Sequence, residues 1–395
     1  MPRGHDRDGG AADRALSYRV RLRLELGDAL RRAGRPDEAE RAYQEARERV
    51  LRSPRRAGES LDPNEAQQWD ARVDARLALL HKVRGANAEA RALIERAITR
   101  ATEAGVAEET PPMYALLAFL LRRERRPEES WQAARRGLRI CRSISRRDER
   151  WQENVAQLLL GLASAAFARK RYVTAERTWR QVLRLASEAT HPHQLGAALN
   201  GVAAVRHVRG DLKGSREALL RSMRFKERAG DLHQIAIGYN NLAEVELRLT
   251  ETATALEHAR RAVRMGEQAR AGSDLADFYR NLAEATLAAG ELEAAIAAGR
   301  KALTIAEDRG RLYLGEAAVT LARTVASVAE VSKPGTIVHT AAREAAAALR
   351  TSLSEHFEEG ELRDKAEECR EILARVSPAL QDKLAIGPGR MEEMG

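Results

Sequence analysis

The chain has 395 residues, of which 44% are hydrophobic, 32% are charged and only 4% are aromatic, and its formal net charge is +9. This length exceeds the usual size of one globular core, and a composition rich in Ala, Leu, Arg and Glu suits packed amphipathic helices. Because no segment alternates β-branched with polar residues, the sequence argues against a strand-rich fold. We therefore expect an all-α protein.

The sequence carries no signal for export, membrane insertion or metal binding. Residues 1–13 are polar and lack the apolar centre of a signal peptide, and no apolar run approaches the ~20 residues that cross a bilayer. Cys141 and Cys369 have no CxxC partner, so neither a disulfide framework nor a zinc site is predicted. We expect a cytoplasmic protein with no metal, no cofactor and no membrane association.

A repeat of about forty residues runs through most of the chain. It is clearest in Tyr239-Asn-Asn-Leu-Ala-Glu and Tyr279-Arg-Asn-Leu-Ala-Glu, which begin 40 positions apart. In the first helix of each unit a small residue follows a large aliphatic one; these small residues are Gly27, Ala78, Ala118, Ala163, Ala203, Ala243, Ala283 and Ala322. A second small residue follows 12 positions later in the first seven units. This pattern predicts stacked helix pairs that bury their apolar faces against their neighbours.

Turn residues and interruptions set the expected boundaries. Glycines that can end a helix fall between the two helices of four units, at Gly34, Gly85, Gly210 and Gly290. We expect residues 1–13 to be disordered, 14–350 to form the array, 351–376 to form a polar capping helix and 377–395 to be a disordered tail. Loops are expected at 52–66, 105–112 and 331–335, where Pro and Gly occur.

The first unit, Leu26-Gly-x-x-Leu30-x-x-x-Gly34-x-x-x-x-Ala39-x-x-x-Tyr43-x-x-Ala46, resembles the tetratricopeptide repeat signature. The later units are similar to the longer, forty-residue form found in kinesin light chains and in the arms of MalT-type bacterial regulators. This resemblance implies a right-handed α-solenoid of about eight helix-turn-helix repeats with a C-terminal capping helix. Proteins of this family serve as scaffolds, adaptors and sensor arms, so the resemblance says little about the particular function.

In tetratricopeptide arrays the first helices line a concave groove, and their polar residues commonly bind the main chain of a peptide. The resemblance places these groove residues at Asn200, Asn240, Asn241, Glu244, Arg280, Asn281 and Glu284. An Asn amide can bond both the N–H and the C=O of a peptide, whatever the sequence of that peptide. A structural alternative stays open, in which the Asn residues bond a neighbouring helix and Arg280 forms a surface ion pair with Glu284.

Three functional hypotheses follow, and none is enzymatic, because the polar residues are spread along the array instead of converging in one pocket. The first is a bacterial scaffold or adaptor that binds a protein or peptide segment. The second is a regulatory sensor arm whose effector domain is on another chain. The third, nucleic-acid binding, rests on the net charge of +14 in residues 1–250 against −5 in 251–395. It ranks last because an Arg excess of 59 over 8 Lys is also typical of GC-rich coding DNA.

Other candidate sites are weaker. His191 and His193 could begin a metal site, but no Cys or carboxylate cluster lies near them in the sequence. A basic cluster in the third unit, at residues 122–126 with Arg135 and Arg136, is expected to lie on solvated helix surface. The four tryptophans are expected to pack in the core or between units; they are Trp69, Trp131, Trp151 and Trp179.

Overall fold

The structure is a computed structural model that describes residues 6–33, 35–51, 61–269, 271–272, 274–307, 311–331 and 336–353. These residues form helices and turns, with no β-strand among them, which confirms the all-α prediction. Contacts divide the chain into two units, Met1–Val205 and Arg206–Gly395. Apart from residues 351–353, the expected capping segment 351–376 lies outside the described residues, and so does the expected tail 377–395.

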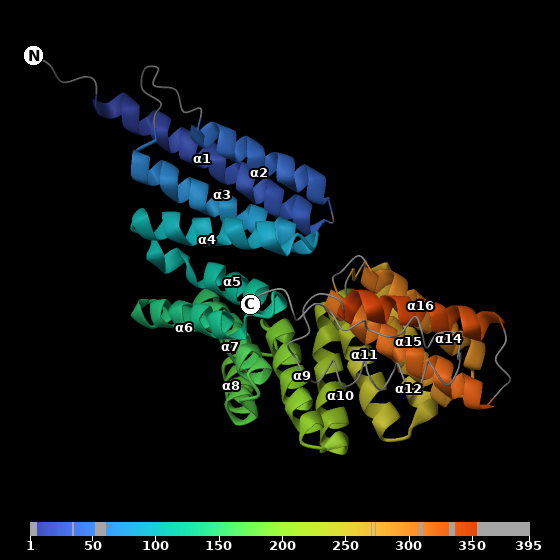
Figure 1. The fold of residues 1–395 in the computed structure, drawn as a ribbon. Helices are drawn as coiled ribbons and strands as arrows, with labels where there is room; N and C mark the ends of the chain where they lie inside the picture. The colour runs from blue at the N-terminus through green and yellow to red at the C-terminus, as the bar shows by residue number, and fades with distance from the viewer. Residues whose placement is uncertain are drawn as a thin grey trace, which may run out of the picture. The chain divides into compact units, whose positions relative to one another are not determined.

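Unit 1 is a series of helix pairs, each joined by a short turn (Figure 1). Several of these helices begin with Pro, whose fixed φ suits the first helical position. Helix α1 begins at Asp6 and so includes residues 6–13, for which the sequence predicts disorder. A short 3₁₀ helix, Ala107–Glu109, precedes α5. The helices are α1 (Asp6–Arg32), α2 (Pro36–Leu51), α3 (Pro63–Val83), α4 (Asn87–Glu103), α5 (Pro111–Arg123), α6 (Pro127–Ser143), α7 (Glu149–Ala168), α8 (Tyr172–Leu185) and α9 (Pro192–Val208).

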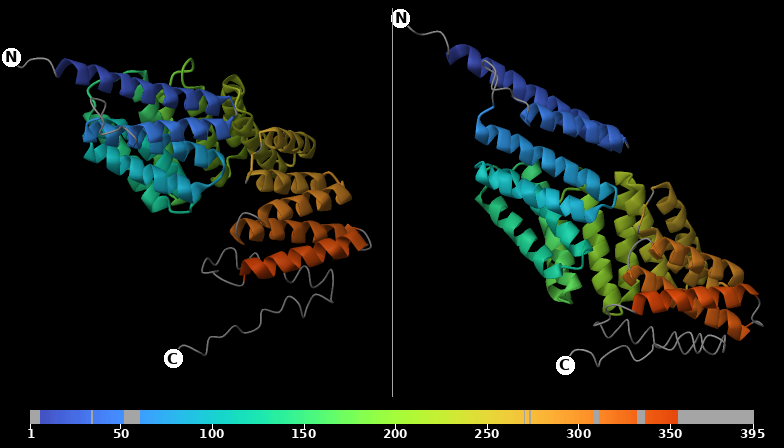
Figure 2. Two further views of the ribbon diagram at one scale, coloured as in Figure 1. Left: turned by 90° about the horizontal axis from the view of Figure 1, so that it is seen from above. Right: turned by 45° about the horizontal axis from the view of Figure 1, so that its top comes forward.

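Unit 2 continues the same pattern from the last turn of α9, and Figure 2 shows its helix pairs stacked one after another. Side-chain caps begin two of its helices: Asp211 accepts from the Gly214 N–H at 2.9 Å, and Asp231 accepts from the Gln234 N–H at 3.1 Å. The helices are α10 (Leu212–Ala229), α11 (Leu232–Arg248), α12 (Thr252–Gln268), α13 (Asp274–Ala288), α14 (Leu292–Glu307), α15 (Arg311–Val331) and α16 (Thr336–Leu353).

The small residues of the repeat are buried, and in the third pair they lie where the two helices cross. All eight first-helix positions are buried. The second small residues are each 0–1% exposed: Ala39, Ala90, Ser130, Ala175, Ser215, Ala255 and Ala295. In the third pair, the Ser130 hydroxyl donates to the Ala118 carbonyl at 2.7 Å, so the two helix backbones approach closely at this crossing. Larger side chains would push the axes apart, which explains why the sequence keeps these positions small.

Six turns inside pairs, those whose residues the structure describes throughout, share one backbone geometry, whether or not they contain glycine. Gly85, Gly210 and Gly290 have φ of 79°, 82° and 78°, as the sequence predicts, whereas Gly34 lies outside the described residues. Three other turns place a non-glycine residue in the same left-handed conformation: Arg125, Lys170 and Thr250. After Thr250 the Glu251 N–H donates to the Glu246 carbonyl at 2.9 Å, and Glu291 donates to Thr286 at the same distance after Gly290.

The turn at Thr250 therefore carries strain that glycine would relieve. We expect Thr250→Gly to raise the free energy of unfolding by about 0.5–1 kcal/mol, because the left-handed strain of about 1–2 kcal/mol exceeds the chain-entropy cost of Gly. The reciprocal change, Gly290→Thr, should lower it by at least about 1 kcal/mol. Urea unfolding followed by circular dichroism measures both variants, and a destabilised Thr250→Gly would contradict the strain argument.

One lysine is buried in unit 2. Lys226, in the last turn of α10, is 3% exposed. Burial lowers the pKa of its ammonium group from 10.5 to about 8, and the charge of Asp231 opposes this shift only in part. Gly238 of α11 packs against the same region, because a Cβ built on it would lie 2.1 Å from Met223 Sδ and 3.4 Å from Lys226 Nζ. The charge of Lys226 is therefore a cost of folding at neutral pH.

This cost has a defined pH dependence. Between pH 8 and 10.5 the unfolded chain retains the proton that folded Lys226 has lost, so the stability of the wild type rises with pH in this window. We expect Lys226→Met to be more stable than wild type at pH 7 by up to about 3 kcal/mol, and this advantage should shrink as pH rises toward 10.5. Paired urea titrations across this range measure it, and a constant difference would contradict the assignment.

Candidate functional site

The first helices of unit 2 lie on the inner side of its curvature. Helix α13 contacts both α11 and α15, whereas contacts between consecutive second helices are fewer. The first helices lie closer to one another than the second helices do. Their solvent-facing side chains therefore share one continuous surface on the concave side of unit 2, which we call the inner face. Helical spacing places the following residues on it: Asn241, Glu244 and Arg248 of α11, Asp277, Arg280 and Glu284 of α13, and Glu316 and Arg323 of α15.

Asn240 and Asn281, two of the predicted groove residues, lie between helices. Their side chains are 8% and 2% exposed, and Asn281 Nδ2 donates to Asn240 Oδ1 at 3.0 Å. This bond joins α11 to α13, which is the geometry of the structural alternative considered for the Asn residues. The sequence pairs Asn240 with Asn200 and Asn241 with Asn281 as equivalent positions, but the bonded pair is offset by one position from that alignment.

The other predicted residues are more accessible. Asn241 is half-buried next to Asn240, and Glu244, one turn further along α11, is 48% exposed. Glu284 is exposed at the equivalent position of α13. Asn200 is half-buried on α9, within unit 1, and therefore does not belong to the inner face of unit 2.

Arg280 is the cation at the centre of the inner face. Its side chain is 31% exposed, and one Nη lies 3.4 Å from a carboxylate oxygen of Asp277. Its Nε atom is buried and has no hydrogen-bond acceptor among the described residues. Burial alone lowers the pKa of Arg280, but the carboxylates around it outweigh that effect and raise the pKa above its ordinary value; they are Asp277, Glu284, Glu316 and Glu244.

The inner face carries four carboxylates, Glu244, Asp277, Glu284 and Glu316, against three cations, Arg248, Arg280 and Arg323. Partial desolvation raises the pKa of both Asp277 and Glu284, Arg280 lowers each only in part, and Arg323 also lowers that of Glu284. Glu316 further raises the pKa of Asp277, and Glu244 does the same for Glu284. Carboxylates from α11, α13 and α15 therefore repel one another across the face, so a positively charged group placed between them would be stabilised.

Several polar residues at this site were missed by sequence analysis. Asp277 precedes Arg280 by three positions, and this helical spacing could have signalled it. Glu316 lies in the eighth unit, where the repeat pattern fades, so no alignment pointed to it. His233 Nε2 of α11 lies 2.8 Å from Asp274 Oδ2 of α13, which adds a second polar link between these helices.

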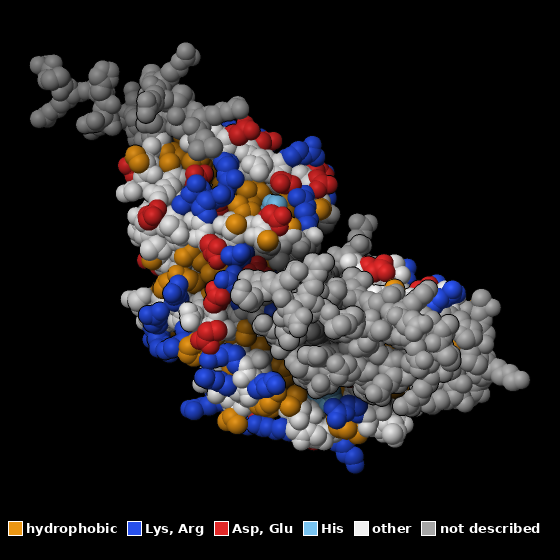
Figure 3. All heavy atoms as spheres, in the orientation of Figure 1, with side chains coloured by type: hydrophobic (Ala, Val, Ile, Leu, Met, Phe, Trp, Pro, Cys, Tyr) orange, Lys and Arg blue, Asp and Glu red, His pale blue; other side chains and the backbone are white. Residues whose placement is uncertain are grey.

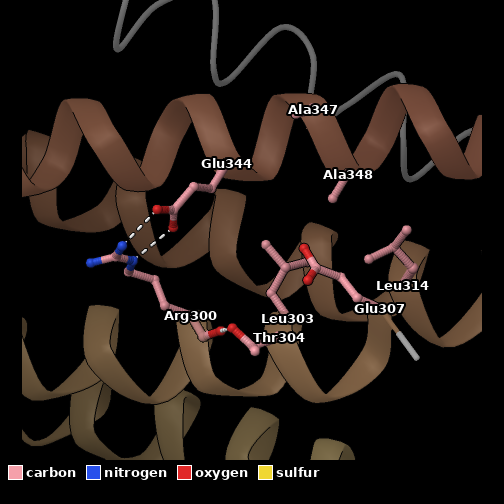
Figure 4. A pocket seen from close by; sticks show the side chains of 8 residues that line it. All are labelled: Arg300, Leu303, Thr304, Glu307, Leu314, Glu344, Ala347 and Ala348. Carbon is pink, nitrogen blue, oxygen red and sulfur yellow. Dashed lines mark hydrogen bonds and ion pairs between the residues drawn. The ribbon is translucent and has the colours of Figure 1, made fainter. Parts of the chain in front are cut away.

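A cleft of about 550 Å³ lies apart from the inner face, between α14, α15 and α16. The Arg300 guanidinium and the Glu344 carboxylate form a two-point ion pair at its wall, with N–O distances of 2.6 and 2.7 Å (Figure 4). Leu303, Leu314 and Ala348 form its apolar part. None of the predicted groove residues lines this cleft.

The remaining candidates do not form a chemical centre within the described residues. His191 is 2% exposed and lies beside Thr190, whereas His193 is exposed. The described residues contain no cluster of three His, Cys, Asp or Glu side chains that could hold a metal ion. Burial raises the pKa of the Cys141 thiol to about 11. No helix in the described ranges is long and apolar enough to cross a membrane.

No protein-family model matches the chain, and no curated protein matches it. Solved structures share its fold. A Rap protein complexed with Competence and Sporulation Factor is 14% identical, with a TM-score of 0.60 over 93% of this chain and 99% of that chain. The quorum sensor NprR from B. thuringiensis, in its apo form, is also 14% identical, with a TM-score of 0.60 over 82% and 87%.

A third structure, aspartyl phosphate phosphatase F from Bacillus subtilis, is 11% identical, with a TM-score of 0.55 over 87% of this chain and 94% of that chain. At such identities the likeness establishes the fold and nothing further. The chain is therefore a tetratricopeptide-like helical repeat protein in fold, as its sequence signature predicts.

The bond between Asn240 and Asn281 predicts a stability effect. Asn281→Ala leaves the buried Asn240 amide without its partner, so we expect it to lower the free energy of unfolding by about 1–3 kcal/mol. A double-mutant cycle with Asn240→Ala, measured by urea unfolding, should give a coupling energy of about 1 kcal/mol. Glu244→Ala, at an exposed position of the same face, should change stability by less than about 0.5 kcal/mol. A coupling near zero would show that the bond does not hold α11 to α13.

Proposed function

We propose that the chain is a non-enzymatic cytoplasmic scaffold that binds a protein or peptide segment on the inner face of unit 2. The observation that carries this proposal is Arg280, whose side chain is 31% exposed and is surrounded by carboxylates from three consecutive first helices. A peptide carbonyl could accept a hydrogen bond from the exposed part of its guanidinium. The polar side chains are spread over three helices, which suits an extended ligand better than a small molecule.

The chemistry of the inner face favours a ligand with a positive charge. Glu244, Glu284 and Asp277 approach Arg280 from two helices, and Arg280 neutralises only part of their charge. A Lys or Arg side chain, or a peptide amino terminus, would relieve the repulsion among these carboxylates. Asn241, which is half-buried on α11, carries an amide that could also bond the main chain of the ligand.

A sensor arm is the second candidate. Its support is the fold shared with a protein described as a quorum sensor and with a Rap protein that was solved in complex with Competence and Sporulation Factor. In this version the ligand would change the packing between repeats, which are in contact only with their neighbours. Small-angle scattering distinguishes the two candidates, because a scaffold keeps its radius of gyration when ligand binds and a sensor arm changes it.

The test of binding compares two matched variants with wild type in pull-downs from a nuclease-treated lysate of the source cell. Glu244→Gln with Glu284→Gln removes two charges from the inner face. Glu217→Gln with Glu293→Gln removes two exposed charges from the second helices α10 and α14. We expect the first variant to retain at least about tenfold less partner than wild type, and the second to retain it fully. Equal recovery by all three folded proteins would contradict a binding site on the inner face.

A further inference from the structure

The net positive charge of the chain is concentrated in one segment of unit 1. Residues 122–184 contain 17 Arg and Lys against 7 Asp and Glu, whereas the rest of the chain contains 50 against 51. Arg exceeds Lys along the whole chain, but outside this segment acidic residues balance the cations, so codon usage alone does not account for the local net charge. The segment spans α6, α7 and α8, and Figure 3 shows Lys and Arg side chains gathered over these helices.

Two rows of arginine form this surface, which we call the basic face. On α6 the exposed arginines follow helical spacing, at Arg135, Arg136, Arg139 and Arg142. On α8 they do so at Arg177, Arg180 and Arg184. Both helices pack against α7, so the two rows belong to consecutive second helices of one compact unit. Residues at spacings of three and four point to one side of a helix, and each row therefore presents its charges together.

The carboxylates of residues 122–184 neutralise few of the arginine charges in the two rows. Five of the seven pair with arginines, and four of these have partners outside the rows: Glu124 with Arg91 and Arg126, Glu128 with Arg169, Glu129 with Arg126, and Asp148 with Arg146. Within the rows, Glu176 pairs with Arg180 at 2.7 Å. The guanidinium of Arg135 is held over the ring of Trp131, 4.5 Å from its centroid, so its direction is fixed before any partner binds.

The basic face lacks an exposed apolar centre, and this indicates the class of partner that it binds. Within residues 122–184, all of which the structure describes, Val173 is the one large hydrophobic side chain that is strongly exposed, at 73%. Stable protein interfaces are organised around a buried apolar or aromatic centre. Interfaces with nucleic acid are instead polar and strongly positive, and their affinity comes mainly from phosphate contacts. An Arg surface with no apolar centre fits the second description.

We propose that the basic face of α6 and α8 binds the phosphate backbone of nucleic acid without sequence preference. Arg guanidinium groups suit this role because they donate two parallel hydrogen bonds to phosphate oxygens. This site lies on the second helices of unit 1, whereas the proposed peptide site lies on the first helices of unit 2. The two are therefore testable independently.

Fluorescence anisotropy of a labelled mixed-sequence duplex DNA of about 20 base pairs, with single-stranded RNA of similar length as a second probe, tests the proposal over a range of salt concentrations. The basic-face variant replaces four exposed arginines by glutamine, at Arg139, Arg142, Arg177 and Arg184. A matched control replaces four exposed basic residues elsewhere by glutamine, at Arg41, Arg264, Lys301 and Arg343. Circular dichroism confirms that both remain folded, and poly-glutamate serves as an acidic polypeptide competitor.

We expect wild type and the control to bind at least one of the two probes, with affinity that falls steeply with salt. The basic-face variant should bind that probe at least about tenfold more weakly, and the slope of log affinity against log salt should be smaller by about 3–4. Equal binding by the two variants, or no binding of either probe at low salt, would overturn the proposal. Displacement by poly-glutamate at the same charge concentration would also overturn it, in favour of an acidic protein partner.

Discussion

Burial of small residues at fixed positions of the helix pairs is the constraint on which the rest of the structure depends. In each of the first seven units two or three small side chains are buried, and in the third pair the Ser130 hydroxyl reaches the Ala118 carbonyl directly. A pair packed this tightly cannot bury its whole apolar surface alone, so it requires the next pair, and the stack grows by repetition. The period of about forty residues is the length needed for two helices of about four turns and their turns.

This packing frees other surfaces for function. The crossings occupy the sides of the helices, so the outward side of each first or second helix needs no particular side chain for folding. In unit 2 the first helices use that freedom for the carboxylates around Arg280. In unit 1 the second helices α6 and α8 use it for rows of arginine. The residues of the acidic inner face and those of the basic face can therefore change independently of each other without disturbing the core.

The sequence predicted what depends on local spacing. The repeat register, the helix pairs and the turns at Gly85, Gly210 and Gly290 could be read from it, because burial imposes a regular pattern of small and apolar residues. The left-handed turn at Thr250 was not predicted, since the geometry of the pair imposes it on a residue that does not favour it. The sequence left open whether Asn240 faces a ligand or a neighbouring helix, because this depends on how α11 is rotated against α13, and one position of helix is a rotation of about 100°.

Of the carboxylates around Arg280, Glu244 and Glu284 belong to the predicted groove set, whereas Glu316 escaped prediction because it reaches the inner face from a unit whose repeat pattern is weak. The central claim, that this face receives a polypeptide, can be tested most directly by labelling exposed carboxylates with a carbodiimide and an amine, with and without the recovered partner. Mass spectrometry should show that the partner protects Glu244 and Glu284 while labelling of Glu217 and Glu293 is unchanged. Protection of Glu217 and Glu293 instead, or of none of the four, would contradict the account.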